Sequence, residues 1–399
     1  MYLTKEQEAM LSGEKGETMA KCIQLTVKIG EIYDAENLIP IKSAQIAGVS
    51  YYTVGDAIFS FFKLLSEGNV KVRVPSWLNP AGMDTEKWKE MCIDADFADK
   101  QFQIIQKYRS IGVETTLTCT PYLIGHKPSY GDHLAWSESS AVTMANSFFG
   151  ARTNREGGPS SLAAAIVGYT ANYGMHLTIN RQPTILVNVK ADITSLSDFS
   201  ALGYWYGENY QSKIPYFTKI SGLDVDHAKM LSSAMASSGS VPLFHIQGLT
   251  PEANNIDLAE VDEKVSFTND DLKQIYEHFN QSIKNPELVA IGCPHASFDD
   301  IKTINKLLKN RNLLDEVEFW IFSSRKVANE EKAKSIVLNL ESKGIRVYTD
   351  TCMVVSPAVR NRFNNILTNS AKAAFYLIKG EKTNVNFLSL EEIMELVTN

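Results

Sequence analysis

The chain has 399 residues, of which 44% are hydrophobic and 21% charged, and its formal net charge is −7. This length predicts two or three domains, and this composition is typical of a globular protein with a sizeable core. No basic face or arm stands out, so we expect no nucleic-acid partner. The chain opens on polar residues, and no run approaches the roughly 18 apolar residues of a membrane span. We therefore expect a cytoplasmic protein with no membrane partner.

The first 180 residues mix helical and strand patterns. Apolar residues recur at helical spacing in three stretches, while alternating valines and a later apolar stretch favour two strands. The second of these strands runs into Cys119. The expected elements are helices over 15–33, 53–67 and 96–111 and strands over 70–74 and 113–118.

A stretch of two helices joined by a polar loop carries most of the polar candidates. Ser137 is of a type that caps helices, so we expect it to cap a helix over 138–149. The loop over 152–158 then leads to Pro159, which suits the first turn of a second helix.

From residue 183 onward, strands and helices alternate, which predicts parallel α/β layers. On this pattern we divide the chain into domains over 1–181, 182–285 and 286–399. The expected strands cover 184–189, 214–220, 241–247, 287–291, 317–322 and 345–349, and the expected helices cover 198–207, 225–237, 299–309 and 329–342.

Three of the five cysteines follow predicted strands, namely Cys119, Cys293 and Cys352. The odd count and the absence of any CxxC pair argue against a disulfide framework and a zinc ribbon. Ligands bind at the carboxyl edge of an open α/β sheet, so these three positions suit ligands, although small buried cysteines are an equal alternative on pattern alone. Three thiolates can hold an iron–sulfur cubane and leave one iron free to act as a Lewis acid.

Several long motifs resemble the aconitase X family, and the resemblance spans nearly the whole chain. One departure is Gln45, where the family pattern leads us to expect a histidine. The motifs are the segments 118–123 (TCTPYL), 135–142 (AWSESSAV), 150–158 (GARTNREGG), 292–297 (GCPHAS) and 351–357 (TCMVVSP).

The resemblance implies an aconitase-like α/β fold with three domains around a central iron–sulfur cleft and without the swivel domain. It also implies a 4Fe–4S cluster held by Cys119, Cys293 and Cys352, with one open iron. The length and opening favour a hydro-lyase subunit that dehydrates (R)-5-phosphomevalonate to trans-anhydromevalonate 5-phosphate. We expect a separate small swivel-domain subunit to supply a catalytic serine.

The family context also suggests site residues for an anionic substrate. Arg152 and Arg155 suit carboxylate or phosphate, because a guanidinium binds either in a bidentate fork, although both arginines have a structural alternative in closing their loop. We expect His295 and Ser139 to be catalytic, His295 as a proton donor or as a donor to the cluster. The other expected substrate-binding residues are Ser137, Glu138, Ser140, Asn154, Ser324 and Lys372.

Three rival functions stay open. The first is a cis-3-hydroxy-L-proline dehydratase, which uses the same cluster chemistry on a substrate with an amine. The second is a non-catalytic iron–sulfur sensor, which the lack of a basic surface disfavours. The third is a cysteine hydrolase with Cys119 as nucleophile, for which the sequence offers no paired histidine signature.

Overall fold

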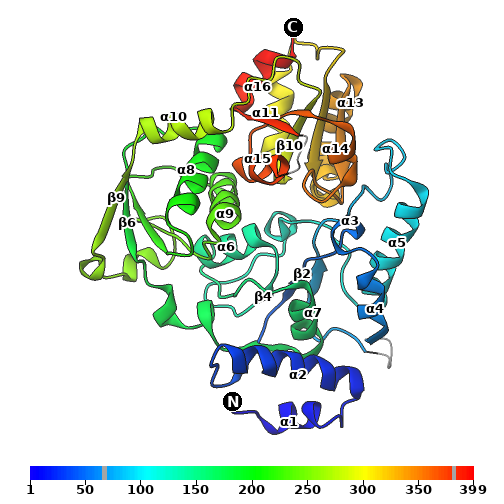
Figure 1. The fold of residues 1–399 in the computed structure, drawn as a ribbon, viewed down its shortest axis with the longest axis vertical. Coiled ribbons are helices and arrows are strands. Elements are labelled where there is room, and N and C mark those ends of the chain that lie inside the picture. The colour runs from blue at the N-terminus through cyan, green and yellow to red at the C-terminus, as the bar shows by residue number, and fades with distance from the viewer. Residues whose placement is uncertain (65–69, 380–382) are drawn as a thin grey trace.

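The computed structural model describes residues 1–64, 70–379 and 383–399, and these residues form four sheets. Figure 1 shows the chain in three regions around a common centre, with the N-terminal helices at the bottom and the C-terminus at the top. We call them the N-terminal region (strands β1–β5), the middle region (β6–β9) and the C-terminal region (β10–β14). No helix in the described ranges is long and apolar enough to cross a membrane.

The N-terminal region is built on a parallel sheet of order β3-β2-β4 and an antiparallel pair, β1 with β5. The buried face of α2, which includes Cys22, Ile23 and Val27, packs on the Ala-rich α7. The strands are β1 (Leu38–Pro40), β2 (Ala44–Ile46), β3 (Ser76–Leu78), β4 (Ala135–Trp136) and β5 (Tyr169–Ala171). The helices are α1 (Lys5–Leu11), α2 (Glu17–Ile32), α3 (Tyr51–Val54), α4 (Ala57–Leu64), α5 (Ala95–Ser110), α6 (Ser139–Ser147) and α7 (Gly158–Val167).

The middle region has a wholly parallel sheet of order β8-β7-β6-β9. Helices α8 and α9 cross closely, because Gly207 and Gly239 leave room for the two backbones to touch. Its elements are β6 (Ile185–Val189), α8 (Leu196–Asn209), β7 (Pro215–Thr218), α9 (Val225–Gly239), β8 (His245–Ile246), β9 (Glu263–Phe267) and α10 (Asn269–His278).

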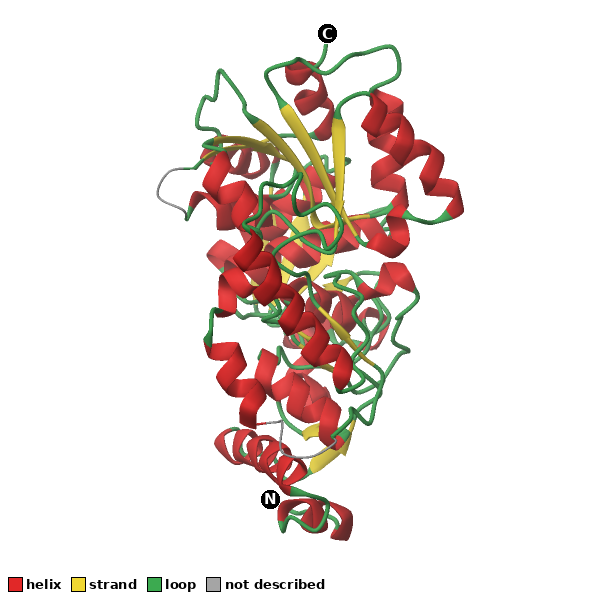
Figure 2. Cartoon of the chain, turned by 90° about the vertical axis from the view of Figure 1, so that its right-hand side faces the viewer, coloured by secondary structure: helices red, strands yellow, loops and turns green. Residues whose placement is uncertain are grey.

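The C-terminal region has a parallel sheet of order β12-β11-β10-β13-β14, with helices on both faces (Figure 2). One face packs against α11, α12, α13 and α16, and the other packs against α14 and α15. The strands are β10 (Leu288–Ala296), β11 (Glu318–Ser323), β12 (Ile345–Thr349), β13 (Asn365–Thr368) and β14 (Asn384–Phe387). The helices are α11 (Phe298–Leu307), α12 (Arg325–Ala328), α13 (Glu331–Ser342), α14 (Pro357–Arg362), α15 (Ala371–Ile378) and α16 (Leu390–Val397).

The predicted α/β class with parallel sheets is confirmed, but several N-terminal elements differ from expectation. The alternating valines of 70–74 form no strand. The backbone of this stretch instead forms hydrogen bonds with loops and with the end of α7. The stretch 113–118 is extended but not a regular strand, because Leu117 has a left-handed backbone with φ of +48°. The helix expected over 53–67 is split into α3 and α4, and residues 65–67 lie outside the described part.

A single glycine sets the approach of α7 to β2. A Cβ added to Gly158 would lie 2.5 Å from the carbonyl oxygen of Ala47, which is too close to be accommodated without moving backbone. The start of α7 therefore packs directly on the loop that follows β2. This contact brings the 152–158 loop beside the carboxyl end of the N-terminal sheet.

We predict that Gly158→Ala lowers the free energy of unfolding by roughly 1–3 kcal/mol, because the added methyl overpacks this contact. The matched control is Gly157→Ala, whose Cβ would meet its nearest neighbour, Ser160 Oγ, at an ordinary 3.7 Å. Urea unfolding of both variants measures the difference. Equal stability of the two variants would contradict the close approach.

Candidate active site

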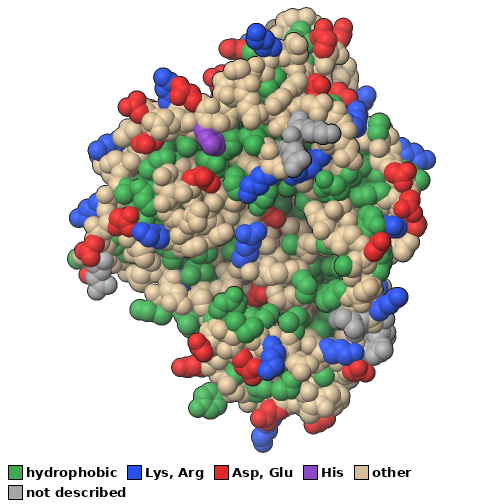
Figure 3. Space-filling view, in the orientation of Figure 1, with side chains coloured by type: hydrophobic (Ala, Val, Ile, Leu, Met, Phe, Trp, Pro, Cys, Tyr) green, Lys and Arg blue, Asp and Glu red, His purple; other side chains and the backbone are tan. Residues whose placement is uncertain are grey.

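The carboxyl ends of strands from two regions face each other across one pocket of about 170 Å³. Parallel strands present their carboxyl ends at one edge, where α/β proteins bind ligands. On the face drawn in Figure 3, lysine and arginine side chains gather over the middle of the molecule among hydrophobic side chains. The lining residues that follow β2, β3 and β4 include Gly48, Asn79 and Glu138, and those from β10 or after β12 and β13 include Cys293, Cys352 and Lys372.

All three predicted cysteine ligands line this pocket. Cys119, Cys293 and Cys352 are free thiols that are 6%, 4% and 8% exposed. The sulfur of Cys119 accepts a hydrogen bond from the backbone N–H of His295 at 3.3 Å. Burial raises the pKa of each thiol, that of Cys293 to about 12, although the Lys372 ammonium opposes the rise.

The donor set fits a cluster better than a single ion. No group of three or more His, Cys, Asp or Glu side chains in the described ranges is arranged to hold one metal ion. Three cysteine thiols that line one small pocket are instead the type of ligand that an iron–sulfur cluster takes. Aconitase-like proteins generally bind a 4Fe–4S cluster.

Glu138 and Lys372 form a buried ion pair at the pocket wall. Lys372 Nζ donates to Glu138 Oε1 at 2.5 Å, and the two side chains are 8% and 15% exposed. Ser140 Oγ donates to the same oxygen at 2.9 Å. Burial opposes the charge on Glu138, but Lys372 and the other donors outweigh it and lower the pKa of this carboxyl to about 2. The pair therefore stays ionised at neutral pH.

The residue at the position where a histidine was expected belongs to the same polar chain. Gln45, at the middle of β2, is fully buried, and its Nε2 donates to Asn79 Oδ1 at 3.2 Å. Asn79 Nδ2 in turn donates to Glu138 Oε2 at 2.8 Å. Gln45 thus orients Asn79, which orients the carboxylate. The side-chain oxygen of Gln45 has no hydrogen-bond partner within the described residues.

His295 lies beneath the pocket rather than in its lining. It is fully buried, with Nε2 2.8 Å from the carbonyl oxygen of Thr351 and Nδ1 3.0 Å from Thr118 Oγ1. A carbonyl oxygen only accepts, so Nε2 carries the proton and Nδ1 accepts from the threonine hydroxyl. Burial lowers the pKa of His295 to about 4, so the ring is neutral at neutral pH. The ring of His295 thus links Thr118 to Thr351, the residues that precede Cys119 and Cys352.

Five of the expected substrate-binding side chains are not in the pocket lining, including that of Ser140, whose hydroxyl donates to Glu138. Ser137 does not cap α6 as expected, because its hydroxyl donates to the carbonyl oxygen of Gln45 at 2.7 Å. The N-cap position is occupied by Glu138. Arg152 donates to the carbonyl oxygen of His176 at 2.8 Å. The amide of Asn154 bonds the backbone of Tyr173 and Met175, and Ser324 caps α12.

Arg155 and Ser139 do line the pocket. Arg155 is exposed, and none of the hydrogen bonds or ion pairs recorded for the described residues involves its guanidinium. Ser139 is the first residue of α6 and is 5% exposed. The pocket therefore holds a hydroxyl and a cation that faces solvent, in addition to the Glu138–Lys372 pair.

Three family models together match most of the chain. The Aconitase X first domain matches residues 1–179, the Aconitase X second domain matches 183–277, and the Aconitase X third domain matches 286–399. The chain belongs to the aconitase X family. The resemblance drawn from the motifs and the three-domain α/β fold are thereby confirmed.

Relatives within the aconitase X family are similar over nearly their whole length. The phosphomevalonate dehydratase large subunit of Methanosarcina mazei is 49% identical over 94% of this chain and 92% of its own. The large subunit of Methanocaldococcus jannaschii is 43% identical over 99% of this chain and 100% of its own. A crystal structure of Thermococcus kodakaraensis aconitase X in its holo-form is 41% identical, covers all of both chains and has a TM-score of 0.92.

Sequence reasoning missed several residues of the pocket, among them Asn79, Ser50 and Tyr376. Asn79 follows β3, and the misplaced strand over 70–74 hid the fact that it sits at a carboxyl edge. Ser50 follows β2, a strand of three residues that is too short to show a pattern. Tyr376 lies one helical turn after Lys372 on α15. A helix recognised at Lys372 would therefore have placed Tyr376 on the same face.

We predict that Lys372→Met lowers the free energy of unfolding at neutral pH by roughly 3 kcal/mol, because it leaves the Glu138 carboxylate buried without its counter-ion. The double variant Glu138→Gln/Lys372→Met is expected to recover most of this loss, because it removes both charges. Urea unfolding of the two variants and the wild type gives the comparison. A single variant as stable as the wild type would show that the ion pair does not hold the carboxylate.

Proposed function

We propose that this chain is the large, iron–sulfur-dependent subunit of a hydro-lyase that dehydrates (R)-5-phosphomevalonate to trans-anhydromevalonate 5-phosphate. The observation that carries the proposal is one pocket lined by three cysteines, a buried ion pair and an arginine that faces solvent. Relatives 42–49% identical over 94% or more of the chain are named phosphomevalonate dehydratase large subunit. Their designation as large subunits supports a separate small subunit as partner, and we expect it to be the swivel domain with a catalytic serine.

In this proposal Cys119, Cys293 and Cys352 hold a 4Fe–4S cluster. When bound, such a cluster supplies a Lewis-acidic iron that assists departure of a hydroxyl group. The cysteines come from separate loops, so the fold must bring them together before the cluster can bind. His295 serves as a positioning residue, because its ring links Thr118 to Thr351 and its backbone N–H meets Cys119 Sγ.

Arg155 is the residue we propose to bind an anionic end of the substrate. Phosphomevalonate carries a carboxylate and a phosphate, and a guanidinium binds either group through two parallel hydrogen bonds. Lys372 is already paired with Glu138, which leaves Arg155 as the unpaired cation among the described lining residues. Ser139, at the start of α6, lines the same pocket and in this proposal offers a hydroxyl to the substrate.

The elimination also needs a base for the proton next to the carboxylate. Glu138 is poorly suited, since its depressed pKa makes it a weak base and its two oxygens already accept from Lys372, Ser140 and Asn79. Among the hydroxyls that line the pocket, we propose that of Ser139, at the start of α6, as the one that contacts the reacting part of the substrate. We expect the small subunit's serine to be the base, which takes this proton on its ionised hydroxyl oxygen.

A dehydratase for cis-3-hydroxy-L-proline is the second candidate. The Pseudomonas aeruginosa protein of that name is 31% identical, and the match covers 65% of its length. A substrate amine calls for a carboxylate that is free to meet it. Glu138, the acidic residue that lines the pocket, is bound to Lys372, which favours the phosphorylated substrate.

We predict that Cys119→Ala, Cys293→Ala and Cys352→Ala each abolish dehydration and lower the bound iron and sulfide, because each removes one thiolate of the cluster. Cys92→Ala is the matched control, since Cys92 is exposed and outside the pocket. The chain is purified anaerobically with its small subunit, and the product is measured by mass. Full activity of any of the three variants would exclude that cysteine as a ligand.

We predict that Arg155→Gln lowers kcat/KM for 5-phosphomevalonate by about 10- to 100-fold, which corresponds to the loss of one charge-assisted hydrogen bond. The matched control is Arg152→Gln, which removes a guanidinium bound to backbone and to Thr178 instead of one in the pocket. Steady-state kinetics should show a raised KM in the first variant and not in the second. The reverse order would move the anion site to Arg152.

A further inference from the structure

We propose that Asp84, Arg325 and Asp350 form a positioning cluster that fixes the Cys352 loop against the N-terminal region and so controls how firmly the iron–sulfur cluster is held. This inference rests on the proposed function, which assigns Cys352 to the cluster. None of the three side chains lines the pocket. We call the three residues the Arg325 clamp.

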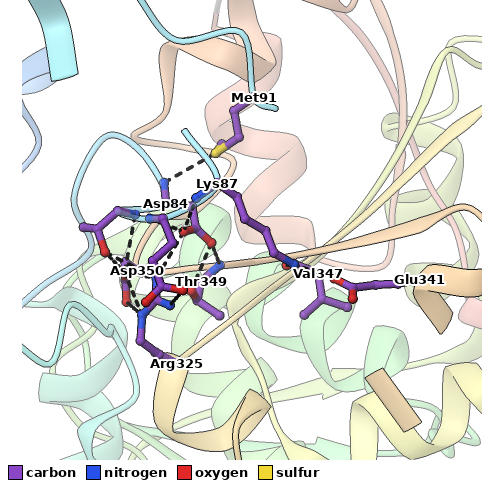
Figure 4. Close-up of polar contacts among 10 residues, drawn as sticks. Asp84, Lys87, Met91, Arg325, Glu341, Val347, Thr349 and Asp350 are labelled. Carbon is purple, nitrogen blue, oxygen red and sulfur yellow. Dashed lines mark hydrogen bonds and ion pairs between the residues drawn. The ribbon is translucent and has the colours of Figure 1, made fainter. Parts of the chain in front are cut away.

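The clamp joins two regions through two buried carboxylates and a guanidinium that is 28% exposed. Arg325, the first residue of α12, donates from Nη2 to Asp350 Oδ2 at 2.6 Å and to Asp84 Oδ1 at 3.1 Å. Its Nε also donates to Asp350 Oδ1 at 3.2 Å, so the guanidinium binds that carboxylate through two nitrogens. Figure 4 shows Asp84 and Asp350 on either side of these contacts with Arg325, and their side chains are 1% and 3% exposed.

The carboxylates also bind across the boundary between the regions. Asp84 Oδ2 accepts from the backbone N–H of Thr349 at 2.7 Å and from its hydroxyl at 3.0 Å. Thr85 Oγ1 donates to Asp350 Oδ2 at 2.6 Å. Each region thus supplies a carboxylate to donors of the other. A charged group buried this way is strongly held, because removing one partner leaves the other unpaired.

The clamp acts directly on the backbone that leads to Cys352. Asp350 has a left-handed backbone with φ of +66°, which aspartate and asparagine tolerate better than most residues. Its carbonyl oxygen accepts from the N–H of Ala81 at 2.8 Å, and Ala81 pairs with Thr351 as an isolated bridge. The loop is therefore fixed both by side chains and by backbone, two residues before the proposed ligand.

The same loop connects to the other cysteines through His295. The carbonyl oxygen of Thr351 accepts from His295 Nε2, and the backbone N–H of His295 meets Cys119 Sγ. A shift of residues 350–352 would therefore disturb Cys352 directly and loosen the contact that aligns Cys119. Groups that orient metal ligands typically change metal affinity when they are removed.

The experiment compares Arg325→Gln and Asp350→Asn with Lys87→Met. Asp350→Asn keeps the size of the side chain and its tolerance for positive φ while removing the charge. Lys87 is a matched control, because it joins the same two regions through Glu341 Oε1 and the carbonyl oxygen of Val347 without touching residues 350–352 (Figure 4). The full-length chain is reconstituted anaerobically with iron and sulfide, and its cluster absorbance is followed after a chelator is added.

We expect Arg325→Gln and Asp350→Asn to lose the cluster about tenfold faster than the wild type, the size of effect usual for residues that orient metal ligands. Lys87→Met should lose it at the wild-type rate even where its melting temperature falls. Cluster loss at the same rate in all three variants would overturn the inference. Any contact between the two regions would then hold the cluster as firmly as the Arg325 clamp does. A wild-type chain that never binds iron would instead overturn the proposed cofactor.

A second measurement needs no cluster. In the metal-free chain, alkylation of Cys352 by iodoacetamide is compared with that of Cys22, which is also buried but lies in a different part of the structure. The clamp variants should speed alkylation of Cys352 and leave Cys22 unchanged, as judged by mass spectrometry of the peptides. Unchanged alkylation of Cys352 in both clamp variants would overturn the inference whether or not the wild type binds iron.

Discussion

Three thiols that are far apart in the chain face one small pocket, and this convergence requires the N-terminal and C-terminal regions to keep a fixed position relative to each other. Cys119 belongs to the first region, whereas Cys293 and Cys352 belong to the last. A sulfur that is misplaced cannot be corrected by its own side chain, since cysteine has a single rotatable bond before its sulfur. Precision at the site therefore depends on contacts between regions.

Buried charges make those contacts, and each joins segments far apart in the chain. The Glu138–Lys372 pair connects α6 to α15 across the pocket. Lys229 of α9 binds Asp300 of α11 at 2.6 Å and lies 3.4 Å from the carbonyl oxygen of His295. Such pairs add little net stability compared with apolar packing, but breaking one leaves a buried charge unpaired. They therefore favour one arrangement of the regions over others.

The sequence could predict the C-terminal half of the fold because apolar runs such as 288–291, which begins the wholly buried strand β10, stand out from amphipathic helices such as α11. The N-terminal half could not be read as well, since β2 and β3 have three residues each and β4 has two. These strands are defined by pairing with one another and not by their own patterns. Leu117 adds a left-handed turn that no apolar spacing reveals.

Residue type and motif could nominate the site residues but could not say which way their side chains turn. Arg152 and Arg155 share one loop, yet Arg152 binds the backbone of His176 whereas Arg155 lines the pocket. His295 follows Cys293 by two residues, and its ring turns beneath the pocket to join two loops. These orientations depend on acceptors from distant segments. Local sequence contains no information on where such acceptors lie.

The charge balance of the pocket gives a physical reason for a second subunit. Lys372 is matched by Glu138, so the described lining residues of this chain leave Arg155 to face a substrate with two anionic ends. A carboxylate and a phosphate that are taken out of water both need charged or hydrogen-bonding partners. In the proposed reaction Arg155 meets one anionic end, so we expect the small subunit to add a charged group for the other end and to help exclude water.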